Sequence, residues 1–199
     1  MDPRSNLFTA MKAAATAGLT VPEICSLLRE ESTHAPVVRK LPPFRAAEQF
    51  ERIRDAVNAA SRTPTVFIAT LGPVAWRRAR ATFASGFFGA AGMNIIDNIG
   101  FDSVKEAAQA AMDAAADVVV LCSDDESYRE LVPAMAAELE QVARTSLLVV
   151  AGYPKNDITA LEQAGVRAFI HVKANAAETL EAILHALDIT VHKDAGKEL

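Results

Sequence analysis

Two stretches of this chain, Val118-Val119-Val120-Leu121 and Leu147-Leu148-Val149-Val150, are apolar at every position. A strand with one face in water alternates apolar and polar residues, whereas a strand covered on both faces can be apolar throughout. The two stretches therefore predict strands at 117–122 and 146–151 that are buried on both sides of one sheet. Three further short apolar runs predict strands at 65–70, 93–97 and 168–171.

In the segments that connect these runs, apolar residues recur at the spacing of a helix. The predicted helices cover 74–88, 103–115, 126–143, 156–164 and 176–187. Strands that alternate with helices form a parallel sheet covered on both faces, so the predicted fold is α/β, a flavodoxin-like doubly wound five-stranded sheet. Ligands of such sheets bind beyond the carboxyl ends of the strands. The loops in question are 70–76, 97–103, 122–127, 151–157 and 171–176.

The residues before the first strand have a different pattern. Amphipathic stretches predict short helices at 5–17 and 20–31, and the prolines at 36, 42 and 43 predict an extended linker, since proline lacks an amide donor. A longer amphipathic helix is predicted at 44–60. We therefore expect a helical segment and linker at 1–43, an α/β domain at 44–191 and a tail at 192–199.

Charge and composition exclude several classes of partner. The net charge is −5 over 199 residues, and both signs are interspersed, so we expect neither nucleic acid nor membrane as a partner. No apolar run approaches the roughly 18 residues that a membrane span requires. Cys25 and Cys122 lack the spacing of a disulfide framework or a zinc site. These features predict a cytoplasmic protein.

Three motifs in the second half of the chain carry a family resemblance. They are Leu131-Val132-Pro133, Ala151-Gly152 and the spaced set Asp157, Leu161, Ala164-Gly165-Val166. Together they resemble the C-terminal, cobalamin-binding domain of methylmalonyl-CoA mutases, and residues 43–54 are similar to the linker that precedes that domain. The resemblance covers most of the chain and leaves out the catalytic barrel, so we expect a fragment or a short natural paralogue.

The resemblance fails at the positions that would bind cobalamin. In cobalamin-binding members, a loop with the pattern Asp-x-His-x-x-Gly supplies the cobalt ligand, the residue that orients it and room for the nucleotide tail. Those three positions are Leu71, Pro73 and Trp76 here. Because proline has no side-chain lone pair, Pro73 cannot ligate cobalt. The resemblance thus implies a degenerate site.

Other loops depart from the family pattern as well. The family's Ser-x-Leu becomes Cys122-Ser123-Asp124, and its Gly-Pro-Gly becomes His171-Val172-Lys173. Ala151 and Gly152, after the fourth strand, complete the degenerate site. We expect no catalytic residue, no bound cofactor and no metal in this chain.

This set of departures resembles the small, non-catalytic branch of the mutase family. The resemblance implies that the chain is not catalytic by itself but forms part of an isomerase, as a heterodimer with a large catalytic mutase subunit. That partner would bind adenosylcobalamin and interconvert methylmalonyl-CoA and succinyl-CoA. The Ala-rich helices would expose apolar faces without a barrel, so self-association or a mobile N-terminus is also expected.

Two other interpretations remain open. One is a cobalamin domain that binds the cofactor weakly without a protein ligand. The other is a receiver-like signalling domain, in which Asp124 or Asp125 would accept phosphate beside Lys173. A receiver also needs an acidic pair after its first strand to hold magnesium, and Leu71-Gly72 supplies none.

Three arginines open the first helix of the predicted domain. Arg77, Arg78 and Arg80 could hold a phosphate, but no Gly-rich loop accompanies them, so a solvated or subunit-facing surface is favoured. The glycines at 86, 89 and 92 precede a strand and therefore predict a helix end and turn, since a dinucleotide fingerprint would follow a strand. Cys122 is interpreted as a small buried residue and not as a nucleophile.

Overall fold

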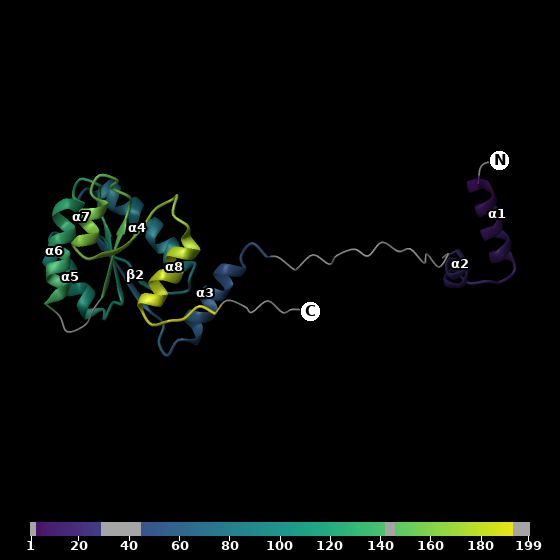
Figure 1. Ribbon diagram of the computed structural model, residues 1–199, viewed down its shortest axis with the longest axis horizontal. Helices are drawn as coiled ribbons and strands as arrows, with labels where there is room; N and C mark the ends of the chain where they lie inside the picture. Colours follow the sequence, from purple (N-terminus) through teal and green to yellow (C-terminus); the bar gives the residue numbers. More distant parts are fainter. Residues whose placement is uncertain (1–2, 29–44, 142–145, 193–199) are drawn as a thin grey trace. The chain divides into compact units, whose positions relative to one another are not determined.

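Figure 1 shows the computed structural model of the chain, which describes residues 3–28, 45–141 and 146–192. The chain divides into two compact units, Met1–Pro43 and Phe44–Leu199. The predicted linker at 32–43 and nearly all of the predicted tail lie outside the described residues. Within the described ranges, no helix is both long enough and apolar enough to cross a bilayer.

The first unit contains two described helices, α1 (Pro3–Thr16) and α2 (Val21–Leu28). Gly18 makes the turn between them with a φ of +89°, which a glycine adopts at little cost. The predicted start of α2 is confirmed, because the amide and the hydroxyl of Thr20 both donate to Glu23 Oε2 at 2.7 Å. These hydrogen bonds lower the pKa of Glu23.

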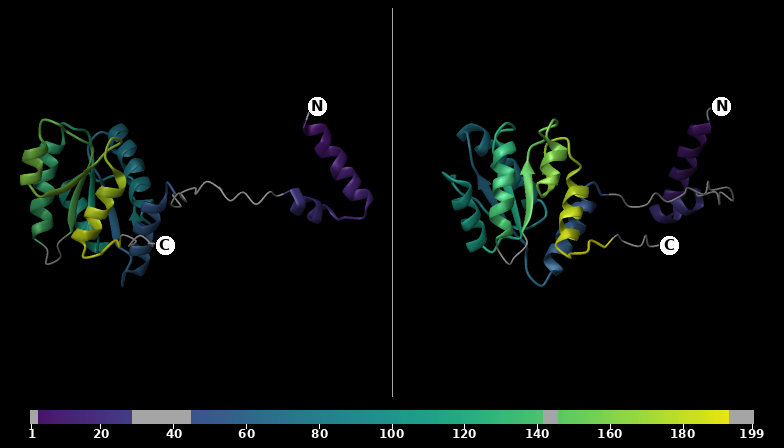
Figure 2. Two further views of the ribbon diagram at one scale, coloured as in Figure 1. Left: turned by 45° about the vertical axis from the view of Figure 1, so that its right-hand side comes forward. Right: turned by 60° about the vertical axis from the view of Figure 1, so that its left-hand side comes forward.

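The second unit contains five strands and six helices in its described part (Figures 1 and 2). In chain order they are α3 (Glu48–Ala59), β1 (Thr65–Thr70), α4 (Val74–Gly89), β2 (Asn94–Ile96), α5 (Val104–Asp113), β3 (Val118–Cys122), α6 (Tyr128–Glu140), β4 (Leu147–Ala151), α7 (Ile158–Gln163), β5 (Val166–Ile170) and α8 (Ala176–Ala186). Every pairing is parallel, and the strand order is β2-β1-β3-β4-β5. The predicted flavodoxin-like sheet is confirmed.

Helices cover both faces of this sheet and enclose two apolar cores (Figure 2). The first core lies under α3, α4 and α8 and includes Ile53, Phe88 and Leu180. The second lies under α5, α6 and α7 and includes Tyr128 and Leu161. Strands β1 and β3 are buried at every residue, as uniformly apolar runs predict.

The edge strands differ from their predicted limits. β5 begins at Val166, two residues before the predicted start, and its second residue, Arg167, is exposed. Only one side of β5 has a neighbouring strand, so a charged residue is tolerated there and the apolar run begins later than the strand. β2, at the opposite edge, has only three residues.

Side chains and glycines set several helix ends. The Ser103 hydroxyl accepts a hydrogen bond from the Glu106 amide at 3.2 Å and caps α5, and the side-chain Oδ1 of Asn175 accepts one from the Glu178 amide at 3.4 Å and caps α8. Helix α4 ends at Gly89, and a turn with Gly92 at a φ of +75° leads to β2. The glycines at 86–92 are thus a helix end and turn, as predicted.

Candidate functional site

The carboxyl ends of the parallel strands bring five loops to one edge of the sheet. After β1 the chain continues into α4 on one face, and after β3 it continues into α6 on the other. The crevice between the ends of β1 and β3 is therefore the topological switch point, where sheets of this kind bind ligands. The sequence-predicted site residues all lie on this edge.

The loop after β1 offers no ligand to that crevice. The Leu71 amide continues the β1–β3 pairing by donating to the Cys122 carbonyl at 3.1 Å, and its side chain is buried in the second core. Gly72 has a φ of +76°, and a Cβ at this position would overlap the Ser123 hydroxyl. Pro73 precedes α4 as its N-cap residue. Its saturated ring offers no donor atom to the crevice, and the prediction that a metal ligand is missing here stays a prediction.

Arg80 crosses the switch point. It belongs to α4, and its Nη2 donates to Asp125 Oδ1, in the loop after β3, at 2.6 Å. Its guanidinium carbon lies 5.2 Å from the centre of the Tyr128 ring and 5.6 Å from that of Trp76, both within cation–π range. A Cβ added to Gly152 would lie 2.6 Å from Arg80 Nη1, so only glycine leaves room for it. This arginine thus links helix α4 to the loops after β3 and β4.

The prediction of a solvated surface is wrong for Arg80. Its side chain is only 16% exposed, because the α4 turn that carries it faces the loop after β3. Arg77 is half-buried and approaches the Gly72 carbonyl, with Nη1 at 3.4 Å, whereas Arg78 is exposed as expected. Trp76 is 57% exposed and lies against Arg80, so the residue that crosses the crevice is Arg80 and not Trp76.

Tyr128 joins the ends of β3 and β4 beneath this arginine. Its hydroxyl accepts the Ser123 amide at 3.1 Å and donates toward the carbonyls of Ala151 at 2.7 Å and Leu121 at 3.2 Å. Burial raises the pKa of Tyr128, so the hydroxyl stays protonated and can serve as a donor. Sequence reasoning missed this residue, which no local pattern distinguishes from an ordinary core tyrosine.

Cys122 is fully buried at the end of β3. Burial raises the pKa of its thiol to about 12, with Arg80 acting in the opposite direction and Asp97 in the same one. A neutral, inaccessible thiol is a poor nucleophile, because the thiolate is the reactive form. The interpretation of Cys122 as a small buried residue is confirmed.

The loops after β4 and β5 meet through two rings. The His171 ring lies 4.6 Å from the Tyr153 ring, and His171 Nδ1 accepts the Lys173 amide at 3.2 Å. Val172 and Lys173 are exposed beyond them. His171 therefore packs against the neighbouring loop and hydrogen-bonds within its own.

A receiver-like phosphorylation site finds little support at this edge. Asp125 is paired with Arg80, and the pKa of Asp124 is lowered chiefly by a hydrogen bond with Ser127. Lys173 follows β5, but the loop after β1 contributes no carboxylate. Nowhere in the described ranges do three His, Cys, Asp or Glu side chains gather as metal ligands would.

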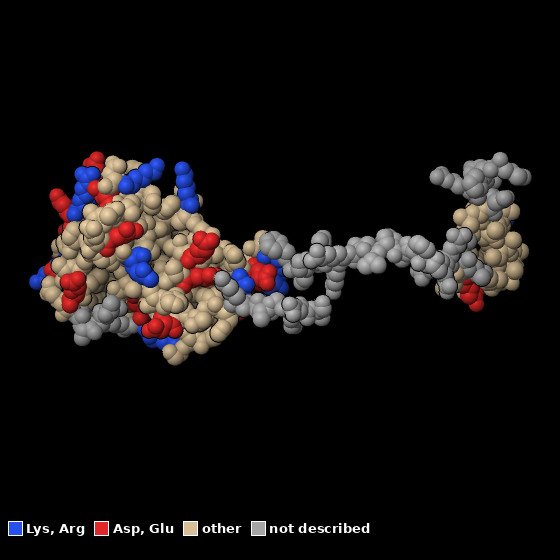
Figure 3. Space-filling model, in the orientation of Figure 1, with Lys and Arg blue, Asp and Glu red and all other residues tan. Residues whose placement is uncertain are grey.

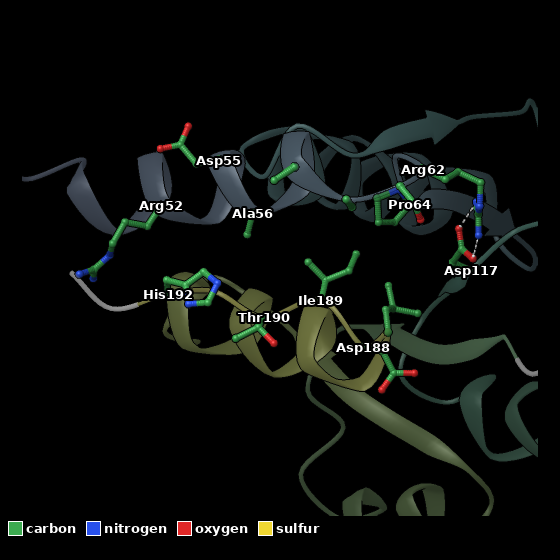
Figure 4. Close-up of a pocket in the computed structure, with 14 residues that line it drawn as sticks. Arg52, Asp55, Ala56, Arg62, Pro64, Asp117, Asp188, Ile189, Thr190 and His192 are labelled. Atoms are coloured by element: carbon green, nitrogen blue, oxygen red, sulfur yellow. Dashed lines mark hydrogen bonds and ion pairs between the residues drawn. The ribbon is translucent and has the colours of Figure 1, made fainter. Parts of the chain in front are cut away.

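A cavity of about 690 Å³ opens at the opposite, amino end of the sheet (Figure 4). It lies between α3 and the segment after α8, with Ile189 near its middle and Arg52 and His192 at one end. At the other end of the cavity, Arg62 forms a bidentate ion pair with Asp117. The Asp117 carboxylate also accepts a hydrogen bond from the Thr65 amide at 2.8 Å. This network anchors the start of β1 and was not predicted from the sequence.

Comparison with known proteins places these observations in a family. No protein-family model matches the chain. The methylmalonyl-CoA mutase small subunit of Porphyromonas gingivalis is 46% identical over 148 residues, and that of Streptomyces virginiae is 41% identical over 105 residues. The alignments cover 73% and 50% of this chain, and 23% and 17% of those proteins. The chain belongs to the methylmalonyl-CoA mutase family.

In P. gingivalis, the mutase small subunit is more similar to this chain than the large subunit is. The mutase large subunit of P. gingivalis is 32% identical over 129 residues, against 46% for the small subunit, and the alignment covers 62% of this chain and 18% of that protein. The chain thus spans less than a quarter of the length of these relatives.

The residues at the carboxyl edge do not fit a ligated cobalamin. Leu71 and Pro73 carry no donor atom in their side chains, and Arg80 lies between helix α4 and the loops after β3 and β4. His171 is turned toward the Tyr153 ring and a backbone amide. At the switch point of this mutase homologue, the Arg80 side chain lies against Asp125, Trp76, Tyr128 and Gly152.

Proposed function

We propose that the chain is the cofactor-free, C-terminal α/β domain of a methylmalonyl-CoA mutase small subunit, with a structural role in assembly. One observation carries this proposal: Arg80 joins helix α4 to the loops after β3 and β4 across the switch point, where a ligand would have to bind. The ion pair with Asp125, the contacts with the Trp76 and Tyr128 rings and the close approach to Gly152 all hold the Arg80 side chain in this position.

The proposed partner is a large, catalytic mutase subunit. P. gingivalis has both a small and a large mutase subunit that are similar to this chain, which supports an enzyme built from two kinds of subunit. In this proposal the large subunit binds adenosylcobalamin and interconverts methylmalonyl-CoA and succinyl-CoA, and this chain contributes no catalytic residue. We place it in the cytoplasm, where its two cysteines would remain free thiols.

Co-purification tests the assembly role. The full chain, carrying an affinity tag, is co-expressed with a mutase large subunit from the same genome, and the eluate is analysed by native mass spectrometry. We expect a stable complex, and an excess of intact small subunit should displace the chain because both would occupy the same surface. Elution of the chain without the large subunit, or binding that the intact small subunit leaves unchanged, would refute the role.

A further inference from the structure

The cavity of about 690 Å³ at the amino end of the sheet is bounded by elements of the α/β unit. Helix α3 forms one wall, and the segment 187–192, which follows α8, forms the other (Figure 4). That segment is fixed in place, because Asp188 turns the chain with a φ of +60° and the Ile189 amide donates to the Leu184 carbonyl at 2.9 Å. Ile189 and Val191 also pack against the first core. The cavity is therefore part of the folded unit, and its size is typical of small-molecule sites.

The middle of the cavity is apolar. Ala56 on α3 and Ile189 on the facing segment both point into the space between the two walls (Figure 4). The other apolar residues that line the cavity are Ala59, Ala60, Pro64 and Leu187. Along α3, the wall from Arg52 to Ala60 extends over about 12 Å at the helical rise of about 1.5 Å per residue. A short unbranched hydrocarbon chain suits such a wall, because each methylene that it removes from water adds to the affinity.

One end of the cavity presents a guanidinium with an unsatisfied donor. Arg52 lies at this end, and the His192 ring lies on the facing segment (Figure 4). The Nε of Arg52 is buried and has no hydrogen-bond partner within the described part of the chain. A buried donor without a partner is costly, so this group should bind an acceptor that comes from outside the chain.

The other charges of the cavity are balanced or point away from it. Arg62, at the far end, is paired with Asp117, so this end carries little net charge. Asp55 and Asp188 line the cavity, but both are exposed and their carboxylates point away from the space between the walls (Figure 4). Figure 3 shows charges of both signs dispersed over the visible face of the α/β unit, with no large area of one sign. This pattern favours a ligand with one negative charge over a polyanion.

We propose that the cavity at the amino end binds a carboxylate with a short unbranched hydrocarbon chain. The carboxylate accepts hydrogen bonds from Arg52, and the chain lies between Ala56 and Ile189 and ends before the Arg62–Asp117 pair. The charged hydrogen bonds fix the orientation of the ligand, while burial of the methylenes supplies most of the affinity. The proposal goes beyond the assembly role and does not depend on it, because none of these residues lies at the carboxyl edge of the sheet.

Titration of the isotope-labelled full chain with butanoate, hexanoate and octanoate, followed by NMR, tests the proposal. We expect octanoate to shift the amide signals of Ala56, Ala60 and Ile189, with a dissociation constant of roughly 0.1–1 mM. Affinity should rise by roughly three- to fourfold for each methylene that is added. Octanamide, which has the same chain without the charge, should bind more weakly than octanoate by about tenfold.

Three variants locate the binding site. Arg52→Gln, which lacks the charge, should weaken octanoate binding by about tenfold, and Ala56→Trp should abolish it by filling the apolar middle of the cavity. Arg54→Gln is the matched control, since Arg54 is on the same helix, is exposed and does not line the cavity, and it should leave the affinity unchanged.

Several results would overturn the proposal. One is the absence of any shift in the cavity signals at roughly 10 mM octanoate. Others are shifts confined to residues outside the cavity, an affinity that does not depend on chain length, and equal binding by Arg52→Gln and Arg54→Gln. The arginine variants decide the question even if Ala56→Trp fails to fold, because both substitutions are made at side chains outside the apolar cores.

Discussion

Arg80 is the residue that contacts the most groups at the switch point. Its guanidinium lies between two aromatic rings, pairs with Asp125 and approaches Gly152 more closely than any residue with a Cβ would allow. Asp125 is 53% exposed, so the ion pair itself contributes little stability. Most of the stabilisation should come from packing and from cation–π contact with the rings of Trp76 and Tyr128.

Replacing this arginine should therefore lower stability. We expect Arg80→Met to reduce the free energy of unfolding by about 1–3 kcal/mol, through the lost ring contacts and ion pair. Arg78→Met, two positions earlier on the same helix and exposed, should change it by less than about 0.5 kcal/mol. Urea unfolding followed by circular dichroism measures both values. Equal effects of the two substitutions would show that Arg80 is an ordinary surface residue.

Cys122 predicts a pH dependence of stability. Its pKa is raised from 9.0 to about 12 in the folded state, so between these values the folded chain keeps a proton that the unfolded chain loses. The folded state then binds more protons than the unfolded state, and the free energy of unfolding falls as pH rises above about 9, by up to about 1.4 kcal/mol per pH unit. Below about 8 this group has no effect on the slope.

Cys122→Ala isolates this contribution, because it leaves Tyr128 and the lysines in place. Urea unfolding of both chains between about pH 8 and pH 10.5 should give a shallower decline for the variant, whatever its absolute stability. Parallel declines would mean that the thiol ionises with the same pKa in the folded and unfolded chain.

Two glycines have opposite expected behaviour, Gly72 just before the start of helix α4 and Gly86 inside it. Gly72 has a positive φ and no room for a Cβ beside Ser123, whereas Gly86 lies within the helix with no atom near the Cβ position. We expect Gly72→Ala to destabilise the chain by about 1–3 kcal/mol and Gly86→Ala to stabilise it by up to about 1 kcal/mol. Thermal unfolding of the two variants side by side checks both signs, and a stabilising Gly72→Ala would show that this loop is wrongly described.

At the level of elements, the sequence predicts a strand where the burial of that strand alone determines which residues it contains. β3 and β4 were predictable because burial on both faces requires apolar residues throughout. The start of β5 was not predictable, since an edge strand tolerates an exposed arginine, Arg167, as its second residue. The Arg80 contacts were not predictable either, because they join residues 45 and 72 positions apart, in loops that only the folded sheet brings together. The glycine at 152 is the one local sign that something approaches closely there.

At the scale of the whole molecule, sequence identity shows the family of the chain, whereas the side chains at the carboxyl edge of the sheet determine what that edge can bind. Identity to small subunits of mutases establishes the family, and the parallel sheet provides the edge at which ligands of such folds bind. The side chains at that edge then determine what it can bind. Because Pro73 offers no donor atom and Arg80 lies across the switch point, we propose that this domain does not hold cobalamin.

Equilibrium dialysis of the full chain against adenosylcobalamin tests that claim most directly, with visible absorbance as the readout and the Pro73→His variant in parallel. We predict equal cobalamin concentrations on both sides of the membrane for the wild-type chain. The same result is expected for Pro73→His, because a ligand restored at 73 would still lack an orienting residue at 71 and would still face the closed crevice. Retention of cobalamin by the wild-type chain at roughly micromolar or tighter affinity would contradict the account.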